Sequence, residues 1–490
     1  ELADVHVERE ADHVRYVDGS SGRWVAYRFD AATGRVASAT TSDGRTVGYE
    51  YDELGRLVAV RRDRGDLTYE LAEHGFLAGI LDADGVVVCR NTYDEAGRVL
   101  AQVESHGRRT AYEYRADGVS TQTSDDGEPP NVMVHDRRGR LTAMIDGLGN
   151  TMRVTYDDDD NIVQIVDRTG AVTRYLHDER GNLVRRTDPD GLTATFTWDE
   201  LDRLVSETDR ALNTTTYHYE GEQHGPTRVV QPDGSEIRFT YDERGLITSV
   251  ADADGVTARL EWDRDGLVTA VENGMGERIS FRYDAAGRRI GADAPAGFST
   301  VMELDAAGRV LTMRSPEGER RFAYTPAGRV RAAALESGAG WEATIDDAGD
   351  LAALHDANGP LARFERDLIG RVVATTTADG ATSRVEYDPV GRPVATVDAL
   401  GGREETAYDP EGRPVQVTDA SGRTWSRDLD VLGRVTMSVG PDGGTVIRSY
   451  HPNGELAEVT DSAGRQWTYE VDAMGRVVAA TDPLGATTTY

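Results

Sequence analysis

Apolar and polar residues alternate over short stretches along most of the chain. Val154 and Tyr156 share one face of such a stretch, as do Phe196 and Trp198, while Thr and Arg occupy the places between them. A period of two over about six or seven residues is typical of a half-buried β-strand. Helical periodicity is absent, and the 53 glycines would interrupt any long helix. The pattern therefore predicts an all-β protein.

Turn signals of the form Asp-x-x-Gly separate the strands. Asp178 to Gly181 forms one turn, Asp188 to Gly191 forms the next, and Asp199 opens the third, so the steps are 10 and 11 residues. An Asp at the first position accepts hydrogen bonds from the turn backbone, and a Gly at the fourth takes a positive φ, as in a type I turn followed by a G1 bulge. Two strands and two turns every 21 residues predict an antiparallel meander of β-hairpins.

A motif Tyr-Asp-x-x-Gly-Arg marks the repeats. The residue before its Asp, called the lead residue here, falls at Tyr156, His177, Trp198 and Tyr219 and resumes at Tyr241 after a 22-residue step. The turn that follows the lead residue is called the lead turn, and the other turn of each repeat the second turn. At this period the chain holds about 23 repeats, or about 46 strands. The structural motif positions we predict are Tyr51, Asp52, Gly55, Arg56, Tyr93, Asp94, Gly97, Tyr241, Asp242, Gly245, Tyr283, Asp284, Gly287, Tyr387, Asp388, Gly391, Tyr408, Asp409 and Gly412.

The repeats divide into two continuous regions. Residues 1–130 hold divergent copies, and residues 131–490 hold a regular array that ends within a repeat. A loop is expected at 126–130, and 221–226 is a second irregular segment. Because the chain begins with Glu1 and not with Met, we expect it to be a fragment or a processed product. A β-propeller is the alternative fold, since two repeats match the length of a four-stranded blade, although motif strength does not alternate at that spacing.

The motif, repeated more than a dozen times in register, resembles the RHS/YD-repeat family. The resemblance covers almost the whole chain. It implies a spiralling antiparallel β-ribbon that forms an open barrel or a cocoon wall. In bacterial members, which include polymorphic toxins and the shell components of Tc toxins, such a shell commonly encloses a C-terminal toxin. The related teneurins use the barrel in cell adhesion. At this length we expect one or two turns of the spiral, from a ribbon of the order of 220 Å.

The charge of the chain limits its partners. There are 86 Asp and Glu against 54 basic residues, all of them Arg, and the net charge is -32. Such a chain repels nucleic acid phosphates, and it has no apolar run long enough to cross a membrane. Much of the acidity follows from the turns, because each repeat uses about two Asp as turn openers. We attribute the exclusive use of Arg to codon bias, with forked recognition of carboxylates as the alternative.

No catalytic, cofactor-binding or metal-binding constellation is predicted. Cys89 lies in an apolar run and is interpreted as a strand residue, and the stretch 157–161 (DDDDN) as a turn and not a calcium loop. His218 and His224 form only a mild cluster near the irregular segment. The lead aromatic rings are expected to pack across strands, with sugar stacking as the less favoured reading.

The sequence thus predicts a structural encapsulation scaffold and not an enzyme. Its expected partners are an enclosed toxin polypeptide or other RHS segments of the same protein, with a secretion-apparatus component as a further candidate. The expected location is secreted or on the cell surface. The alternative is an extracellular adhesion or carbohydrate-binding module that uses exposed aromatics such as Trp425 and Trp467. An enzyme would need a site built from the irregular segments 121–131 and 220–226.

Overall fold

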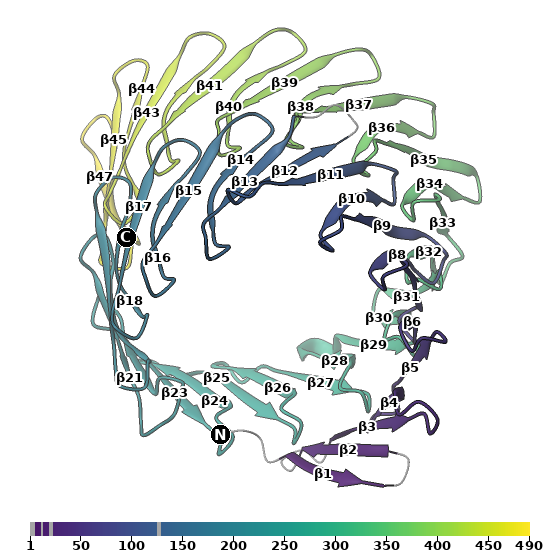
Figure 1. Cartoon of the computed structure of the whole chain (residues 1–490). Helices are drawn as coiled ribbons and strands as arrows, with labels where there is room; N and C mark the ends of the chain where they lie inside the picture. The colour runs from purple at the N-terminus through teal and green to yellow at the C-terminus, as the bar shows by residue number, and fades with distance from the viewer. Residues whose placement is uncertain (1–4, 11–12, 19–22, 125–128) are drawn as a thin grey trace. The chain divides into compact units, whose positions relative to one another are not determined.

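The computed structural model describes residues 5–10, 13–18, 23–124 and 129–490. Within these residues the chain forms one sheet of 47 strands, in which neighbouring strands pair antiparallel, as β15 with β16 and β16 with β17. The described residues contain no α-helix, only the short 3-10 turn η1 at Pro295–Gly297. The predicted all-β ribbon of hairpin repeats is confirmed, and the sheet is not divided into propeller blades (Figure 1).

The first 24 strands form the early stretch of the ribbon. They are β1 Val5–Arg9, β2 His13–Asp18, β3 Trp24–Phe29, β4 Val36–Thr41, β5 Thr46–Tyr51, β6 Leu57–Arg62, β7 Leu67–Leu71, β8 Leu77–Leu81, β9 Val87–Tyr93, β10 Val99–Glu104, β11 Arg109–Tyr114, β12 Val119–Ser124, β13 Asn131–His135, β14 Leu141–Ile145, β15 Thr151–Tyr156, β16 Ile162–Val166, β17 Val172–His177, β18 Leu183–Thr187, β19 Thr193–Trp198, β20 Leu204–Thr208, β21 Thr214–His218, β22 Arg228–Val230, β23 Glu236–Tyr241 and β24 Ile247–Asp252.

The remaining 23 strands form the late stretch. They are β25 Gly255–Trp262, β26 Val268–Asn273, β27 Arg278–Tyr283, β28 Arg289–Asp293, β29 Ser299–Leu304, β30 Val310–Ser315, β31 Gly318–Tyr324, β32 Val330–Leu335, β33 Gly340–Ile345, β34 Leu351–Asp356, β35 Gly359–Arg366, β36 Val372–Thr377, β37 Thr382–Tyr387, β38 Pro393–Val397, β39 Arg403–Tyr408, β40 Pro414–Thr418, β41 Thr424–Leu429, β42 Val435–Val439, β43 Thr445–Tyr450, β44 Leu456–Asp461, β45 Gln466–Val471, β46 Val477–Thr481 and β47 Thr487–Thr489.

The turns have the predicted geometry. In the lead turn at residues 52–55, Gly55 N donates to Asp52 O at 2.8 Å and Asp52 N donates to Arg56 O at 2.9 Å. Gly55 has φ +74°, and the strand register shifts between Glu50 and Tyr51, which is the expected bulge. Where Asp160, Asp202 or Leu212 takes the glycine place, it adopts the same left-handed backbone, with φ 70°, 58° and 68°.

The irregular segments only partly match the expectation. The loop expected at 126–130 falls largely on residues 125–128, which lie outside the described residues. At 221–226 the ribbon does depart from the repeat, because β22 has only three residues and no strand covers residues 219–227. The carbonyls of Gly221 and Gln223 accept hydrogen bonds from Arg203 Nη1 at 2.8 and 2.7 Å, so this loop is tied to the preceding repeat.

The sheet is a single layer, so its core lies in the plane of the strands. The most buried hydrophobic residues are alanines on the strand that follows a lead turn, such as Ala59 and Ala270, which are 2% and 1% exposed. No large side chain among the described residues is fully buried. Because these alanines are small, larger side chains on the same face of the sheet can cover them. Stability therefore comes from contacts between neighbouring strands and not from packing of two layers face to face.

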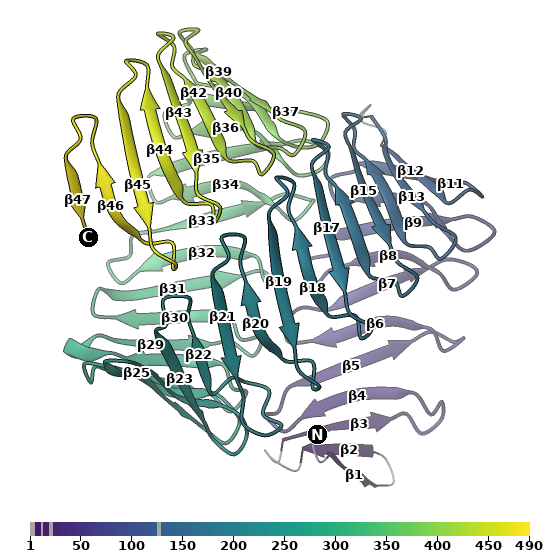
Figure 2. The ribbon, with the colours of Figure 1, turned by 90° about the vertical axis from the view of Figure 1, so that its left-hand side faces the viewer.

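The chain divides into two compact units. The main parts of unit 1 are Glu1–Tyr112 and Ala258–Thr382, and those of unit 2 are Glu128–Thr257 and Ser383–Tyr490. Each unit therefore combines a piece of the early stretch with a piece of the late stretch. In unit 1 these pieces are β1–β10 and β26–β36, and in unit 2 they are β13–β24 and β38–β47 (Figures 1 and 2).

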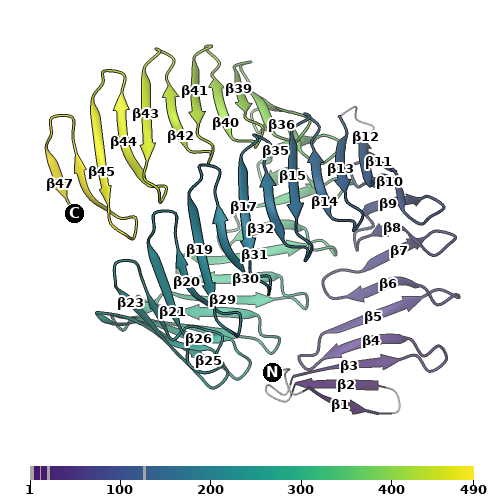
Figure 3. The same cartoon turned by 60° about the vertical axis from the view of Figure 1, so that its left-hand side comes forward.

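Within each unit the two pieces of ribbon meet edge to edge. In unit 1, Asp84 accepts hydrogen bonds from Thr325 Oγ1 at 2.7 Å and Ala327 N at 3.0 Å. In unit 2, Glu411 Oε1 accepts from Arg168 N at 2.6 Å, and Asp233 Oδ2 accepts from Arg476 Nη2 at 2.9 Å. Figure 3 shows the strands of unit 2 that carry these turns.

These edge contacts obey one rule. Each joins a second turn of the early stretch to a lead turn of the late stretch, and the hydrogen-bonded residues are 241 to 245 positions apart. That offset is about eleven and a half 21-residue repeats, and the half repeat brings unlike turns together. The contacts are consistent with the expected spiralling ribbon, whose successive passes must lie edge to edge.

Candidate functional site

The lead turn is held by its own aspartate. Asp388 Oδ1 accepts hydrogen bonds from the backbone N–H of Val390 at 3.1 Å and of Arg392 at 2.9 Å. Asp388 Oδ2 accepts from Arg392 Nε at 2.6 Å, so one arginine closes the turn through both its backbone and its side chain. The same Asp–Arg pair occurs in the lead turns that begin at Asp52, Asp94, Asp136, Asp199, Asp284, Asp305, Asp367, Asp409, Asp430 and Asp472.

These hydrogen bonds favour the ionised form of Asp472 and Asp52. The side chain of Arg476, followed by its backbone N–H, holds the pKa of Asp472 below its usual value. For Asp52 the backbone N–H of Arg56 is the larger cause of the lowered pKa. A general acid or base needs a pKa near neutrality, and these carboxylates are shifted the other way. The turn aspartates are therefore structural acceptors.

The lead residue fixes each repeat to the preceding strand. Tyr450 donates its hydroxyl hydrogen to the carbonyl of Val435 at 2.7 Å, and the Arg434 guanidinium lies 4.6 Å from the centre of its ring. The hydroxyl bond to a carbonyl 14 to 16 residues earlier recurs at Tyr51, Tyr93, Tyr156, Tyr219, Tyr241, Tyr283, Tyr324 and Tyr408. Trp198 makes it through Nε1 to Leu183 O at 2.8 Å. The ring thus has a polar partner at its tip and a cation over its face.

The motif arginine connects successive repeats. Arg392 pairs with Asp388 of its own turn, lies 4.8 Å from the ring centre of Tyr408, and donates from Nη1 to the carbonyl of Asp409 at 3.0 Å. The same bond to a carbonyl of the next lead turn is made by Arg56, Arg140, Arg288 and Arg309, so these arginines form a ladder along one edge of the ribbon. The alternative interpretation, forked recognition of carboxylates, describes the Asp–Arg part of this role, which codon bias alone does not explain. The signal was present, because the arginine stands four residues after an Asp and 16 before the next aromatic ring.

The predicted motif positions depart from this pattern in one of the listed repeats. Tyr241 donates its hydroxyl hydrogen to Pro226 O at 2.9 Å, but Leu246 occupies the arginine place after Gly245. Asp242 is paired instead with Arg244 from the tip of its own turn. The glycines of the motif at 55, 97, 245, 287, 391 and 412 all have a positive φ.

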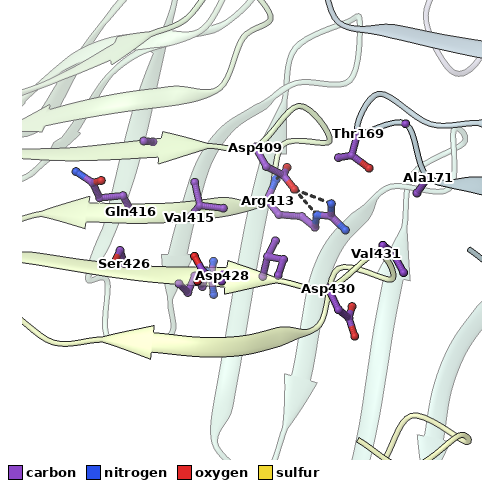
Figure 4. Close-up of a pocket in the computed structure, with 14 residues that line it drawn as sticks. Thr169, Ala171, Asp409, Arg413, Val415, Gln416, Ser426, Asp428, Asp430 and Val431 are labelled. Atoms are coloured by element: carbon purple, nitrogen blue, oxygen red, sulfur yellow. Dashed lines mark hydrogen bonds and ion pairs between the residues drawn. The ribbon is translucent and has the colours of Figure 1, made fainter. Parts of the chain in front are cut away.

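A pocket of about 730 Å³ lies where a lead ring is missing (Figure 4). Leu429 stands at the lead position, and Arg427 Nε donates to Pro414 O, the bond that a lead tyrosine would otherwise make. The Asp409–Arg413 pair lies on one side, and Thr169 of an early second turn lies on the other. The pocket is thus a local gap in the ladder. Asp409, Arg413 and Asp430 in its lining are already used by the lead turns.

The other candidate residues lie in ordinary ribbon positions. Cys89 is a β9 residue, and burial raises the pKa of its thiol, with a smaller contribution from Glu104, which disfavours the reactive thiolate. Asp160 pairs with Arg138 and Arg140 and therefore belongs to the ladder and not to a calcium loop. Among the described residues no group of three or more His, Cys, Asp or Glu could hold a metal ion, and no helix could cross a membrane.

The fold and its ladder define the chain as a tandem-repeat β-scaffold. The RHS repeat family model matches residues 29–67, 156–193, 177–215, 223–257, 262–299, 346–382, 367–403, 408–445 and 450–487. These matches together cover more than half of the chain. The chain therefore belongs to the RHS repeat family. A search of curated protein sequences finds no significant match.

Solved structures share the fold at low sequence identity. The crystal structure of TcdB2-TccC3 aligns with a TM-score of 0.55 and 15% identity over 96% of this chain and 28% of that chain. The crystal structure of TcdB2-TccC3-TEV aligns with a TM-score of 0.50 and 13% identity over 98% of this chain and 35% of that chain. The chain thus spans about a third or less of the length of these proteins.

Proposed function

We propose that the chain is a wall segment of an RHS shell that encloses and protects a toxin polypeptide for secretion or delivery. The observation that carries this proposal is the edge contact between early and late stretches in each unit. A ribbon whose passes are hydrogen-bonded edge to edge forms a wall without gaps between passes. Membership of the RHS repeat family and the fold shared with TcdB2-TccC3 support the same function.

The seam between passes is joined by ion pairs. In unit 1, Arg329 forms ion pairs with both Asp82 and Asp84, each at 2.6 Å, and all three side chains are largely buried. His106 Nε2 lies 2.6 Å from Asp350 Oδ2 at the next seam position. A partly buried pair with several hydrogen bonds is stronger and more geometrically specific than a surface ion pair. These pairs therefore hold the early and late stretches together and also cover the space between them.

The proposed mechanism is physical and not catalytic. The turn carboxylates are used as turn acceptors, and the family relatives in the structural comparison share a scaffold fold. We propose that the motif residues, such as Tyr51, Asp52 and Arg56, have a structural role in the wall. We also propose that residues 1–130 and 131–490 are divergent and regular parts of one array. The partners we propose are the enclosed toxin polypeptide or other RHS segments, in a secreted or cell-surface location.

Limited proteolysis tests the wall. A continuous seam should confine early cleavage by a broad-specificity protease to the turn tips of uncovered edges and to the chain ends. The fragment pattern is read by mass spectrometry on the intact 490-residue chain. Rapid cutting at many internal repeats, including the covered second turns, would sink the proposal.

Enclosure needs a separate test on the full-length gene product. The region outside the ribbon should resist protease in the unmodified protein and become sensitive when the seam is opened by Asp84→Asn together with Arg329→Ala. The matched control is Asp379→Asn, which changes the same turn position on an uncovered edge. A cargo that is digested equally in all three proteins would contradict enclosure.

The adhesion alternative receives no support from the comparisons. Trp425 is 40% exposed, but the Arg423 guanidinium lies 5.6 Å from its ring centre and covers one face. The Arg465 guanidinium lies in the same way 5.9 Å from the ring centre of Trp467. A sugar needs an open aromatic face, so these rings are poor stacking platforms. Binding on a glycan array that is lost with Trp425→Ala would reverse this preference.

A further inference from the structure

The seam contacts within unit 1 carry an ordered pattern of charge. Two positions define it: the third residue of an early second turn, and the residue that follows the glycine of the late lead turn opposite. At one pair of turns these residues are Asp84 and Arg329, joined at 2.6 Å. At the next pair they are His106 and Asp350, also joined at 2.6 Å. The carboxylate has thus moved from the early stretch to the late stretch.

The reversal arises because an acid replaces the arginine of the motif. In the ten late lead turns that begin at residues 284 to 472, the residue after the glycine is Arg in eight and acidic in two, namely Asp350 and Glu455. An acid at this place cannot form the ion pair of the lead turn. In the turn of Asp350 the opening residue is Asp346, so two like charges stand four residues apart. The exchange therefore weakens the turn in which it occurs.

A repeat array offers several nearly equivalent ways of joining two passes. The seam register is defined here as the choice of which late lead turn faces which early second turn. A shift by one repeat again places a second turn against a lead turn, and the backbones of successive turns are alike. Contacts of the backbone alone therefore do not select one register. Selection needs a feature that differs from one turn to the next, and the charge after the glycine is such a feature.

In unit 1 a shift by one repeat would remove the observed pairs. If Asp84 faced the next late lead turn, it would meet Asp350 in place of Arg329. If His106 faced the preceding one, it would meet Arg329 in place of Asp350. The side chains of Asp84 and His106 are only 15% and 13% exposed, so solvent screens such contacts weakly. Arg64, in the preceding second turn, favours none of these registers, because residues 288, 309 and 329 are all Arg.

Unit 2 shows the same arrangement by itself. Asp233 pairs with Arg476 at 2.9 Å, and its side chain is 24% exposed. The late lead turn one repeat earlier carries Glu455 at the place of Arg476. A shift in that direction would therefore bring two carboxylates together. Like charges in direct contact suppress a wrong pairing.

We propose that Asp350 and Glu455 determine the seam register, each by excluding a pairing that is shifted by one repeat. His106 is the residue that matches Asp350, since a carboxylate at that position would be repelled. The proposal gives a specificity role to two residues that break the repeat motif. It concerns the seam already present within each unit and does not depend on the enclosed cargo.

Cysteine pairs report the seam register. Ala327→Cys is combined in turn with a Cys at the second position of three successive early second turns, in Asp63→Cys, Ala83→Cys or Ser105→Cys. The single native cysteine is replaced by Ser. In the observed register Ala327 N donates to Asp84, beside the second of these positions. A shift by one repeat moves the turns by two strands, about 10 Å, so it displaces the pattern of the three cross-linking yields by one place.

Recoding the seam should release the register. The recoded variant is His106→Asp, Asp350→Arg and Glu455→Arg, which gives these positions the polarity of Asp84 and Arg329. The observed pairs then remain attractive, but the shifted pairs become attractive as well. We expect the share of cross-links from a shifted register to rise at least about tenfold above that of the unmodified chain.

The matched control separates recoding from weakening of the seam. The variant His106→Ala, Asp350→Ala and Glu455→Ala removes the same side chains but gives the shifted registers no new ion pair, so it should keep the pattern of the unmodified chain. Circular dichroism checks that each protein keeps its β-structure. An unchanged pattern in the recoded variant would overturn the proposal. An equal shift in the recoded and alanine variants would also overturn it, because loss of the observed pairs would then be the cause.

Discussion

At the scale of single residues, the arginine after each lead turn explains most of the repeat motif. It needs an Asp four residues earlier to hold its Nε, and a ring in the next repeat to lie under its guanidinium. Arg434 meets both needs with Asp430 and Tyr450. Lysine has no planar fork and could not satisfy both at once. The absence of lysine from these places thus has a structural reason beside any bias of the gene.

Removing one turn carboxylate should loosen one repeat. Asp388→Ala leaves the N–H groups of Val390 and Arg392 and the Arg392 guanidinium without their acceptor. Bonds to a charged acceptor contribute about 1–3 kcal/mol, so hydrogen exchange at residues 389–392 should accelerate by one to two orders of magnitude. Hydrogen-exchange mass spectrometry measures it. The control is Asp347→Ala, an exposed tip residue for which the structure records no hydrogen bond; equal effects of the two would argue against the clamp.

The lead hydroxyl has a smaller and separable effect. Tyr450→Phe removes the bond to Val435 O and keeps the ring against Arg434, and we expect a local loss of about 1 kcal/mol. Tyr450→Leu removes the ring as well, so the loss of local stability should be larger than in the Phe variant. We also expect a pocket to open, as at Leu429. Exchange rates at residues 434–437 report both. Identical behaviour of the Phe and Leu variants would mean that the ring contributes nothing.

At the scale of strands and turns, the sequence predicted almost everything that is local. Period-two patterning and Asp-x-x-Gly spacing predicted the strands and turns, since both depend on backbone preferences within about ten residues. The Arg434–Tyr450 contact was missed because it joins the two open ends of the β42–β43 hairpin, 16 residues apart, which lies beyond the range of these local preferences. The seam was missed for a stronger reason. Asp84 and Arg329 are 245 residues apart, and no local pattern in the sequence indicates that they meet.

The turns should make the array sensitive to acid. Hydrogen bonds hold the pKa of Asp52, Asp94 and Asp472 below the usual value of 3.8 in the folded chain. Their stabilisation is therefore complete above the unfolded pKa and is lost as the pH falls through the lower folded pKa. We expect a steady urea midpoint from about pH 7 to 5 and a decline below about pH 4. Far-UV circular dichroism follows it.

Protonation also has an effect on stability that opposes this prediction. Protonation of acids outside the turns relieves the repulsion that comes from a net charge of -32, which would raise stability as the pH falls. A urea midpoint that increases below pH 4 would show that repulsion outweighs the turn clamps. In Arg476→Met, which removes the larger cause of the shift, the pKa of Asp472 measured by NMR should rise toward its usual value.

At the scale of the whole molecule, the seam couples segments that are remote in sequence. Arg329→Ala removes the partner of Asp82 and Asp84 and leaves two carboxylates together at the seam. Exchange should therefore increase at residues 82–86 and at 325–329 in the same variant, although about 240 residues separate them. Asp379→Asn, on the uncovered edge, should produce no such paired change. An increase confined to 325–329 would mean that the two stretches are not held together here.

The offset between the two stretches also constrains how a gene for such a protein can change length. Tandem arrays gain and lose whole units by misaligned recombination. Adding one 21-residue unit between two passes moves the register by a full period, so a second turn still faces a lead turn. A half unit would instead bring two second-turn edges together, so Asp84 and Asp233 would lose the lead-turn arginines that they bind. Selection should therefore keep inter-pass lengths in whole repeats, and leave small insertions to the loop tips that nothing covers.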